Sequence, residues 1–185
     1  MTKVVIILGV ALGAIVLTVA ILGLVAPKRI SVKSSQFIRA SKQQVFDQIR
    51  FMKNFPKWSP FRQQDPDQKY VISGIDGQVG ATFSWEGVKE RSKGSQKIVA
   101  LSGNGIVKIQ CNITEPFQSA PTFDYAIIEK EGGVEVVQDF DTAMPFPANV
   151  FGLLFGLKAK MAETNQQGLE LLKQVSEQPE TVGSN

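Results

Sequence analysis

The pattern of apolar and polar positions divides the chain sharply near residue 27. Residues Val4 to Ala26 form a run of 23 positions without a charged side chain. As a helix with a rise of about 1.5 Å per residue, this run is roughly 35 Å long and can cross a hydrocarbon core of about 30 Å. A lone segment in lipid must satisfy its backbone hydrogen bonds internally, so it has to be helical. We therefore predict a transmembrane anchor over residues 1–27.

A cleaved signal peptide is the alternative for this segment. The apolar core of a signal peptide usually runs about 7 to 15 residues and ends in a small-x-small cleavage site. The run here is longer, and the passable site Thr18-Val19-Ala20 lies inside it. Pro27 directly follows Ala26, which disfavours cleavage at that position. These features favour an anchor that stays attached.

Residues 28–176 show a period of two over several short stretches. Such alternation predicts strands with one apolar face and one solvated face. The apolar positions are Ala81, Phe83 and Trp85; Val107, Ile109, Cys111 and Ile113; Phe123, Tyr125 and Ile127; and Val134, Val136, Phe140 and Met144. Short turns separate them, at Asp76-Gly77, Asn104-Gly105 and Gly132-Gly133. Since tight turns join antiparallel neighbours, we expect a meander of six or seven strands.

Helical patterns flank the predicted sheet. Ser41 and Gln44 form a capping box ahead of a short apolar face. A long helix is predicted from about Ala148 to Val175, and its apolar stripe is Val150, Leu154, Leu157, Met161, Leu172 and Val175. Thr164 and Gly168 share the phase of the stripe but are small, so they indicate either a loose contact or room beneath the helix. Residues 177–185 are a polar tail.

The apolar sheet face and the apolar helix stripe each need a partner that buries them. The sequence therefore predicts an α+β fold, in which a curved antiparallel sheet wraps around the long C-terminal helix. Residues 28–176 form this domain.

Charge and composition exclude several functions. The net charge is +3 and no dense basic face is present, so nucleic-acid binding is not expected. The chain has no histidine and a single cysteine, Cys111. Ser-His-Asp catalysis, Cys-His catalysis and thiolate zinc sites are thereby excluded, and no metal or cofactor is expected.

The residues around the anchor bear on its orientation and its association. Lys28, Arg29 and Lys33 follow the apolar run, whereas Lys3 and the amino terminus precede it. By one charge, the positive-inside rule favours a cytoplasmic domain over an external one. The pair Gly9 and Gly13 has the G-x-x-x-G spacing that lets two membrane helices approach closely, which makes a homodimer a second hypothesis.

Four short motifs occur in a characteristic order. Ala40 precedes the pair Val45-Phe46, and the later segments are Trp58-Ser59-Pro60-Phe61, Val79-Gly80-Ala81-Thr82-Phe83-Ser84-Trp85 and Lys93-Gly94-Ser95-Gln96-Lys97-Ile98. In this order, the chain resembles the START-like superfamily of polyketide cyclases/dehydrases and lipid-transfer domains. Specifically, it resembles the bacterial subgroup with an N-terminal membrane helix. The resemblance implies a helix-grip fold, an apolar cavity between sheet and long helix, and a single-pass protein of the bacterial inner membrane.

The candidate binding residues are mostly aromatic. The parity of the strands places Phe83, Trp85, Tyr125 and Phe140 on one concave wall, together with the polar Gln138. Trp58 and Phe61 are expected near the short helices, and Phe151 and Phe155 near the start of the long helix. A solid core is the alternative to a lined cavity. The inward polar groups then either satisfy one another in the core or orient a ligand.

Three functions follow as hypotheses. The first is membrane-tethered binding or transfer of a hydrophobic small molecule or lipid. The second is a cyclase or dehydratase acting on an apolar substrate, for which Tyr125 is the only inward phenol. The third is a non-catalytic interaction or regulatory domain. The run from Phe151 to Leu157 is apolar on more than one side, so it is buried, touches the membrane or gates the mouth of a cavity.

Overall fold

The computed structural model describes residues 2–89, 91–103 and 105–178 of the chain. In chain order, its elements are α1 (Thr2–Val25), β1 (Arg29–Ile38), α2 (Lys42–Arg50), the 3-10 helix η1 (Met52–Asn54), α3 (Phe55–Trp58), α4 (Pro60–Gln64), β2 (Lys69–Ser73), β3 (Thr82–Glu86), β4 (Lys93–Ser102), β5 (Ile106–Glu115), β6 (Thr122–Lys130), β7 (Gly133–Ala143), α5 (Ala148–Leu154) and α6 (Leu157–Glu177). Asn104 of one predicted turn and residues 179–185 of the predicted tail lie outside the described residues.

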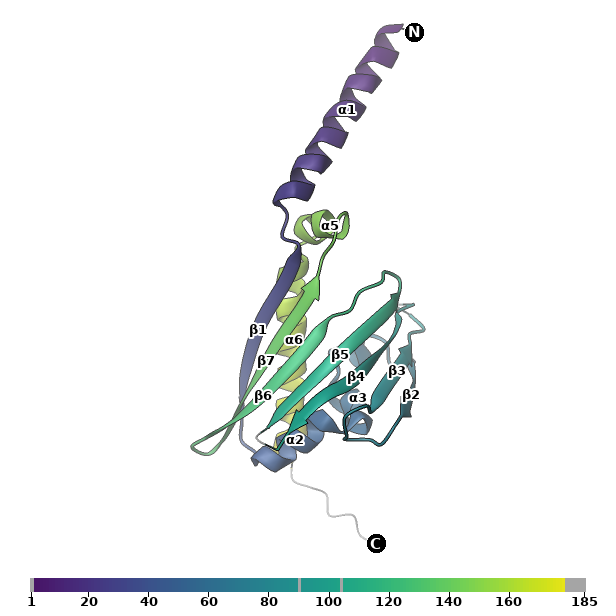
Figure 1. The fold of residues 1–185 in the computed structure, drawn as a ribbon. Helices are drawn as coiled ribbons and strands as arrows, with labels where there is room; N and C mark the ends of the chain where they lie inside the picture. Colours follow the sequence, from purple (N-terminus) through teal and green to yellow (C-terminus); the bar gives the residue numbers. More distant parts are fainter. Residues whose placement is uncertain (1, 90, 104, 179–185) are drawn as a thin grey trace.

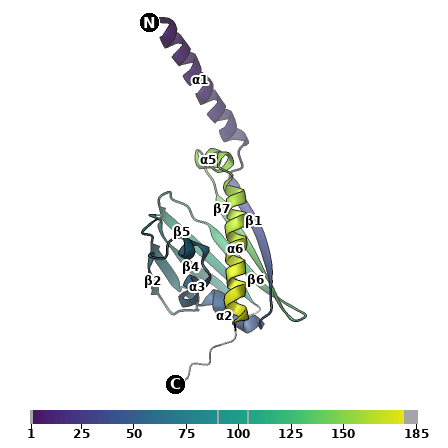
Figure 2. The same cartoon turned by 180° about the vertical axis from the view of Figure 1, so that it is seen from behind.

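The strands form one antiparallel sheet in the order β1-β7-β6-β5-β4-β3-β2. Figure 1 shows the sheet curving, with β2 and β3 at one edge and β1 at the other. Figure 2 shows α6 running along the inner face of β1, β7 and β6. The predicted α+β fold, with a curved sheet of seven strands around a long C-terminal helix, is confirmed.

The long helix differs from its prediction because it is two helices. Gly156 has a φ of +62°, in the left-handed region that side chains with a β-carbon avoid, and this residue separates α5 from α6. The break changes the phase of the first helix, so Leu154 is exposed and does not continue the apolar stripe. Beneath Gly168 there is room for one methyl group. A β-carbon at this position would lie 3.5 Å from Cδ of Pro60, which is ordinary contact.

The short helices close the end of the sheet at which β1 ends. The predicted capping box is confirmed, since Ser41 Oγ accepts from the Gln44 amide at 3.2 Å and Gln44 Oε1 accepts from the Ser41 amide at 3.0 Å. Asp76, in the β2–β3 connection, accepts a hydrogen bond from the Met52 amide at 2.6 Å. This contact holds η1 against the strands.

The first helix extends away from the rest of the molecule (Figure 1). None of its residues is buried. Within the described residues, α1 is the one helix long and apolar enough to cross a membrane, a property that a signal sequence shares.

Candidate ligand-binding site

Two apolar clusters fill the interior between the sheet and α6. The larger cluster joins the sheet to the short helices, and its members include Val45, Ile49, Phe83, Val136, Leu169 and Leu172. The smaller cluster lies where β1 begins and β7 ends, and consists of Ile30, Val32, Phe140 and Met144, with Leu157 and Met161 of α6 packed against it. The interior therefore has two apolar compartments along the axis of α6.

A band of buried polar residues lies where the two clusters meet. We call it the interior polar layer, and its members are Ser34, Tyr125, Gln138 and Asn165. Gln138 is paired in register with Ser34 on β1 and with Tyr125 on β6. Along α6, Asn165 lies one turn after Met161 of the smaller cluster and one turn before Leu169 of the larger.

Hydrogen bonding in the interior polar layer is incomplete. Gln138 Nε2 donates to the hydroxyl of Tyr125 at 3.0 Å. Gln138 Oε1 and Asn165 Nδ2 are both buried and have no hydrogen-bond partner among the residues that the structure describes. Leaving such an atom unpaired costs about 1–3 kcal/mol, and buried polar atoms are normally paired with protein, water or a ligand. The layer thus offers one free acceptor and one free donor inside an apolar interior.

Aromatic side chains line the interior beside this layer. Trp58 and Tyr125 meet edge to face, with ring centroids 6.2 Å apart. Phe55 connects Trp58 to Phe83, with centroid distances of 5.1 Å and 5.3 Å. Trp58 is fixed further because its Nε1 donates to the Gln48 carbonyl at 3.1 Å. The structure therefore brings Trp58, Phe83 and Tyr125 together.

The other aromatic candidates lie in different places. Phe140 belongs to the smaller cluster, where it packs against Phe123 at 5.1 Å. Trp85 is half-buried, and its indole lies over Gly94, where a β-carbon would come within 2.8 Å of the ring. Phe151 and Phe155 stack on each other at 6.3 Å and are exposed, as is Phe61. The structure does not bring these last three residues to the interior.

Burial of the inner face changes along the sheet. At the end next to α2, inward residues such as Val107, Ile127 and Val136 are at most 2% exposed. At the end next to α5, the smaller cluster is at most 9% exposed, but other inward apolar residues are only half-buried, namely Trp85, Ile113, Phe123, Leu157 and Met161. The interior is therefore closed at the α2 end and less covered at the end from which α1 leaves.

Comparison with solved structures decides the fold. The chain matches a protein from Chromobacterium violaceum with a TM-score of 0.59 at 12% identity, covering 80% of this chain and 98% of that one. It matches Ara h 8.0201 with a TM-score of 0.56 at 12% identity, covering 80% and 97%. It also matches the di-domain ARO/CYC StfQ from the steffimycin biosynthetic pathway with a TM-score of 0.59 at 12% identity, covering 80% and 51%. The chain has a START-like fold.

No protein-family model matches the sequence, and no curated protein matches it. At 12% identity the START-like fold is what these neighbours share with the chain.

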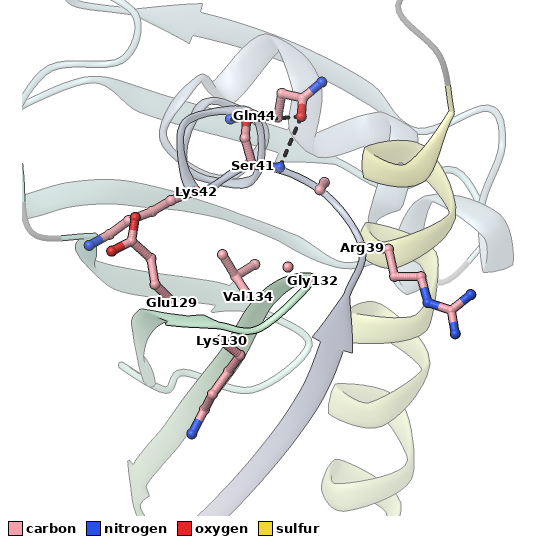
Figure 3. Close-up of a pocket in the computed structure, with 10 residues that line it drawn as sticks. Arg39, Ser41, Lys42, Gln44, Glu129, Lys130, Gly132 and Val134 are labelled. Atoms are coloured by element: carbon pink, nitrogen blue, oxygen red, sulfur yellow. Dashed lines mark hydrogen bonds between the residues drawn. The ribbon is translucent and has the colours of Figure 1, made fainter.

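Two surface hollows of the START-like domain lie at its α2 end. One, of about 620 Å³, is lined by residues 39–42, by Gln44 and by the β6–β7 hairpin. Figure 3 shows that Lys42 and Glu129 lie on one side of it and Arg39 on the other. The second, of about 360 Å³, adjoins the first and shares Ser41, Lys42 and Glu129 with it. Neither opens between the sheet and α6, where the family resemblance implies a cavity.

Two buried titratable groups of the START-like domain, Cys111 and Tyr125, are held neutral. Burial raises the pKa of the Cys111 thiol to about 12. Burial also raises the pKa of Tyr125, the neighbouring Cys111 adds to this, and the hydrogen bond from Gln138 opposes it. Tyr125 therefore acts as a neutral hydroxyl rather than as a base near pH 7. Among the described residues, no group of three or more Asp, Glu, Cys or His side chains is placed to hold a metal ion.

Sequence reasoning missed three residues of this interior, Ser34, Phe55 and Asn165. Ser34 shares the parity of Val32 on β1, and Asn165 lies four positions after Met161, in the phase of the helix stripe. The strand parity of Ser34 and the helix phase of Asn165 could therefore have identified these two residues from the sequence. Phe55 lies in a segment with no regular period, so only the structure identifies its place.

Proposed function

We propose that the START-like domain binds an apolar small molecule or lipid between its sheet and α6, and that α1 anchors it in a membrane. One observation carries the binding proposal: the free acceptor of Gln138 and the free donor of Asn165 are buried next to the less covered end of an apolar interior. Small-molecule sites are mostly apolar and contain a few polar groups that fix orientation.

The ligand places its polar group at the interior polar layer and its apolar body along the half-buried side chains toward α5. A hydroxyl, carboxyl or amide group can bond both Gln138 and Asn165. Because the smaller cluster fills this part of the interior, side chains such as Phe123 and Met161 shift when the ligand enters. Both are half-buried, so they have room to move outward.

The membrane anchor supports the same proposal. An apolar molecule that leaves a bilayer loses the favourable transfer energy that kept it there. A container at the membrane surface shortens the exposure of that molecule to water. The less covered end of the interior is the end at which α1 joins β1 (Figure 1).

Binding is favoured over catalysis by the chemistry of the interior. A cyclase or dehydratase needs a group that moves a proton at the reacting atoms. Tyr125 and Cys111 are inward groups with an acidic proton, and both have raised pKa values and stay protonated near pH 7.

The test uses the full chain, purified in detergent and in lipid nanodiscs. Native mass spectrometry and organic-solvent extraction of the protein should reveal a bound apolar molecule. A brominated fatty acid should quench the fluorescence of Trp58 and Trp85 in a saturable manner, and Gln138→Leu should weaken this quenching. A protein that carries no extractable molecule and shows no saturable quenching would contradict the proposal.

A further inference from the structure

The segment around α5 exposes five large apolar side chains. Phe146, Phe151, Leu153, Leu154 and Phe155 are between 48% and 65% exposed. Phe151 and Phe155 stack on each other rather than on the domain. We call residues 146–155 the α5 segment. On a domain outside the membrane, exposed apolar side chains gathered in one segment mark an interaction site.

The α5 segment is fixed to the end of α1. The side chain of Asn149, which is 2% exposed, donates from Nδ2 to the carbonyls of Gly23 at 3.1 Å and Ala26 at 3.3 Å. The ring of Phe146 packs against Gly23, where a β-carbon would lie 2.9 Å from Cδ2 of the ring. These contacts hold α5 at the level where α1 ends, and Figures 1 and 2 show it lying between α1 and the sheet.

The charges around the α5 segment fit a membrane surface. Lys28 and Arg29 follow α1, and Lys158 and Lys160 follow the α5 segment; all four are exposed. Arg29 also pairs with Asp141 at 2.6 Å. Between residues 142 and 162 the sequence contains no acidic residue. Basic side chains near a membrane surface are attracted to anionic headgroups. Phe and Leu side chains are typical of the apolar face of segments that lie in the interface.

We propose that the α5 segment inserts its apolar side chains into the surface of the bilayer that α1 crosses, with anionic lipid around its flanking lysines. This rests on the membrane anchor of the proposed function and adds a second, interfacial attachment. Leu24 and Val25, at the end of α1, are also exposed apolar side chains. Since Ala148 and Leu157 pack against the smaller cluster, insertion also brings the less covered end of the interior to the lipid.

Spin labels at single cysteines test this in the full chain. Each variant carries Cys111→Ala and one added cysteine at Leu12 of α1, Phe151 or Phe155 of the α5 segment, or Val99 on the outer face of the sheet. The protein is placed in nanodiscs of phosphatidylcholine and phosphatidylglycerol. Electron paramagnetic resonance then compares the accessibility of each label to oxygen, which enters lipid, and to a nickel chelate, which stays in water.

The expected result is an oxygen-to-nickel accessibility ratio at positions 151 and 155 that is several-fold above the ratio at Val99, which is exposed to a similar degree. A low ratio at 151 and 155 would overturn the proposal. Spin–spin broadening at those positions together with a low ratio would also overturn it, and would assign the surface to a second copy of the chain. The Leu12 label separates the two proposals. If position 12 is in lipid and position 155 is in water, only the insertion of α5 fails; if position 12 is in water, the anchor itself fails.

Discussion

At the scale of single residues, two buried asparagines differ in their hydrogen bonding, and we predict opposite effects on stability when each is replaced. Asn165 has an unpaired Nδ2, whereas Asn149 donates to two carbonyls and accepts from the Val150 amide at 3.0 Å. We expect Asn165→Leu to raise the free energy of unfolding of the ligand-free protein by about 1 kcal/mol and to weaken ligand binding, because it removes an unpaired buried donor. Thermal unfolding and the fatty-acid quenching assay measure the two effects.

Asn149→Leu is the matched control. It should lower the free energy of unfolding by about 1–3 kcal/mol, since it leaves the carbonyls of Gly23 and Ala26 without their partner. If Asn165→Leu were as destabilising as Asn149→Leu, Asn165 would be a structural residue and the interior polar layer would not be a free binding surface.

The thiol of Cys111 provides a second residue-scale prediction. Burial raises its pKa from an ordinary 9.0 to about 12, so at pH 8 the folded protein holds about a thousandfold less thiolate than the unfolded chain. Reaction with a chromogenic disulfide reagent at pH 8 should therefore be at least that much slower in the native protein than in denaturant. Equal rates would show that the interior beside Tyr125 is open to water.

The raised pKa of Cys111 also predicts how the free energy of unfolding depends on pH. Well below pH 9 the thiol is mostly protonated in both states, and between about pH 9 and 12 it is ionised mainly in the unfolded chain. The free energy of unfolding should therefore fall as the pH rises through this window. Cys111→Ala should remove part of that fall, which denaturant titrations at pH 8 and pH 10.5 measure.

Residue parity identified the inward side chains well but not their pairing. The period of two placed Tyr125, Gln138 and Phe140 on the inner face, and all three are buried there. The parity could not show that Gln138 meets Tyr125 and leaves its own oxygen unpaired, because this depends on the register between β6 and β7. Phe151 and Phe155 were expected near the start of the long helix as candidate binding residues, and they lie in α5, before the break at Gly156, with exposed side chains.

At the scale of elements, Gly156 separates α5 from α6 by a left-handed residue. We expect Gly156→Ala to lower the free energy of unfolding by about 1–2 kcal/mol, because a β-carbon disfavours this conformation. Gly103→Ala is the control, since no atom lies within 4 Å of the β-carbon it would add. Equal thermal midpoints for the two variants would mean that α5 and α6 can form one continuous helix.

The continuous helix of the sequence prediction fails for a clear physical reason. From Phe151 to Leu157 the residues are apolar on several sides, so periodicity gives no phase there and cannot show a break. The helix after the break keeps its period, and its stripe from Met161 to Leu172 faces the sheet. Periodicity thus predicts an element reliably where one face is apolar and buried and the other is polar and exposed. The α5 segment does not have two such different faces.

At the scale of the whole molecule, the sheet order depends on contacts distant in sequence. Arg29 and Asp141, 112 positions apart, join the start of β1 to the end of β7. Local patterns predicted the strands and their hairpins but carried no information on this pairing. The resemblance to the START-like superfamily implied a helix-grip fold but did not specify this pairing, and the structural neighbours confirm the START-like fold.

Also at the scale of the whole molecule, we predict on which side of the membrane the domain lies. The basic residues after α1 outnumber the charges before it by one, which favours a cytoplasmic domain. In a bacterial host, a protease added to spheroplasts should leave the domain intact and should digest it only after lysis. Digestion in intact spheroplasts would place the domain outside, and a periplasmic marker protein confirms that the protease had access.

The junction between α1 and β1 limits how far the domain can travel. α1 ends at Val25 and β1 begins at Arg29, so the intervening residues 26–28 span about 10 Å even when fully extended. In the anchored protein that we propose, such a short linker keeps the domain at the membrane surface. The domain therefore cannot carry a ligand across an aqueous gap to a facing membrane. Exchange is then confined to the bilayer in which the chain resides, or to a carrier that comes to it.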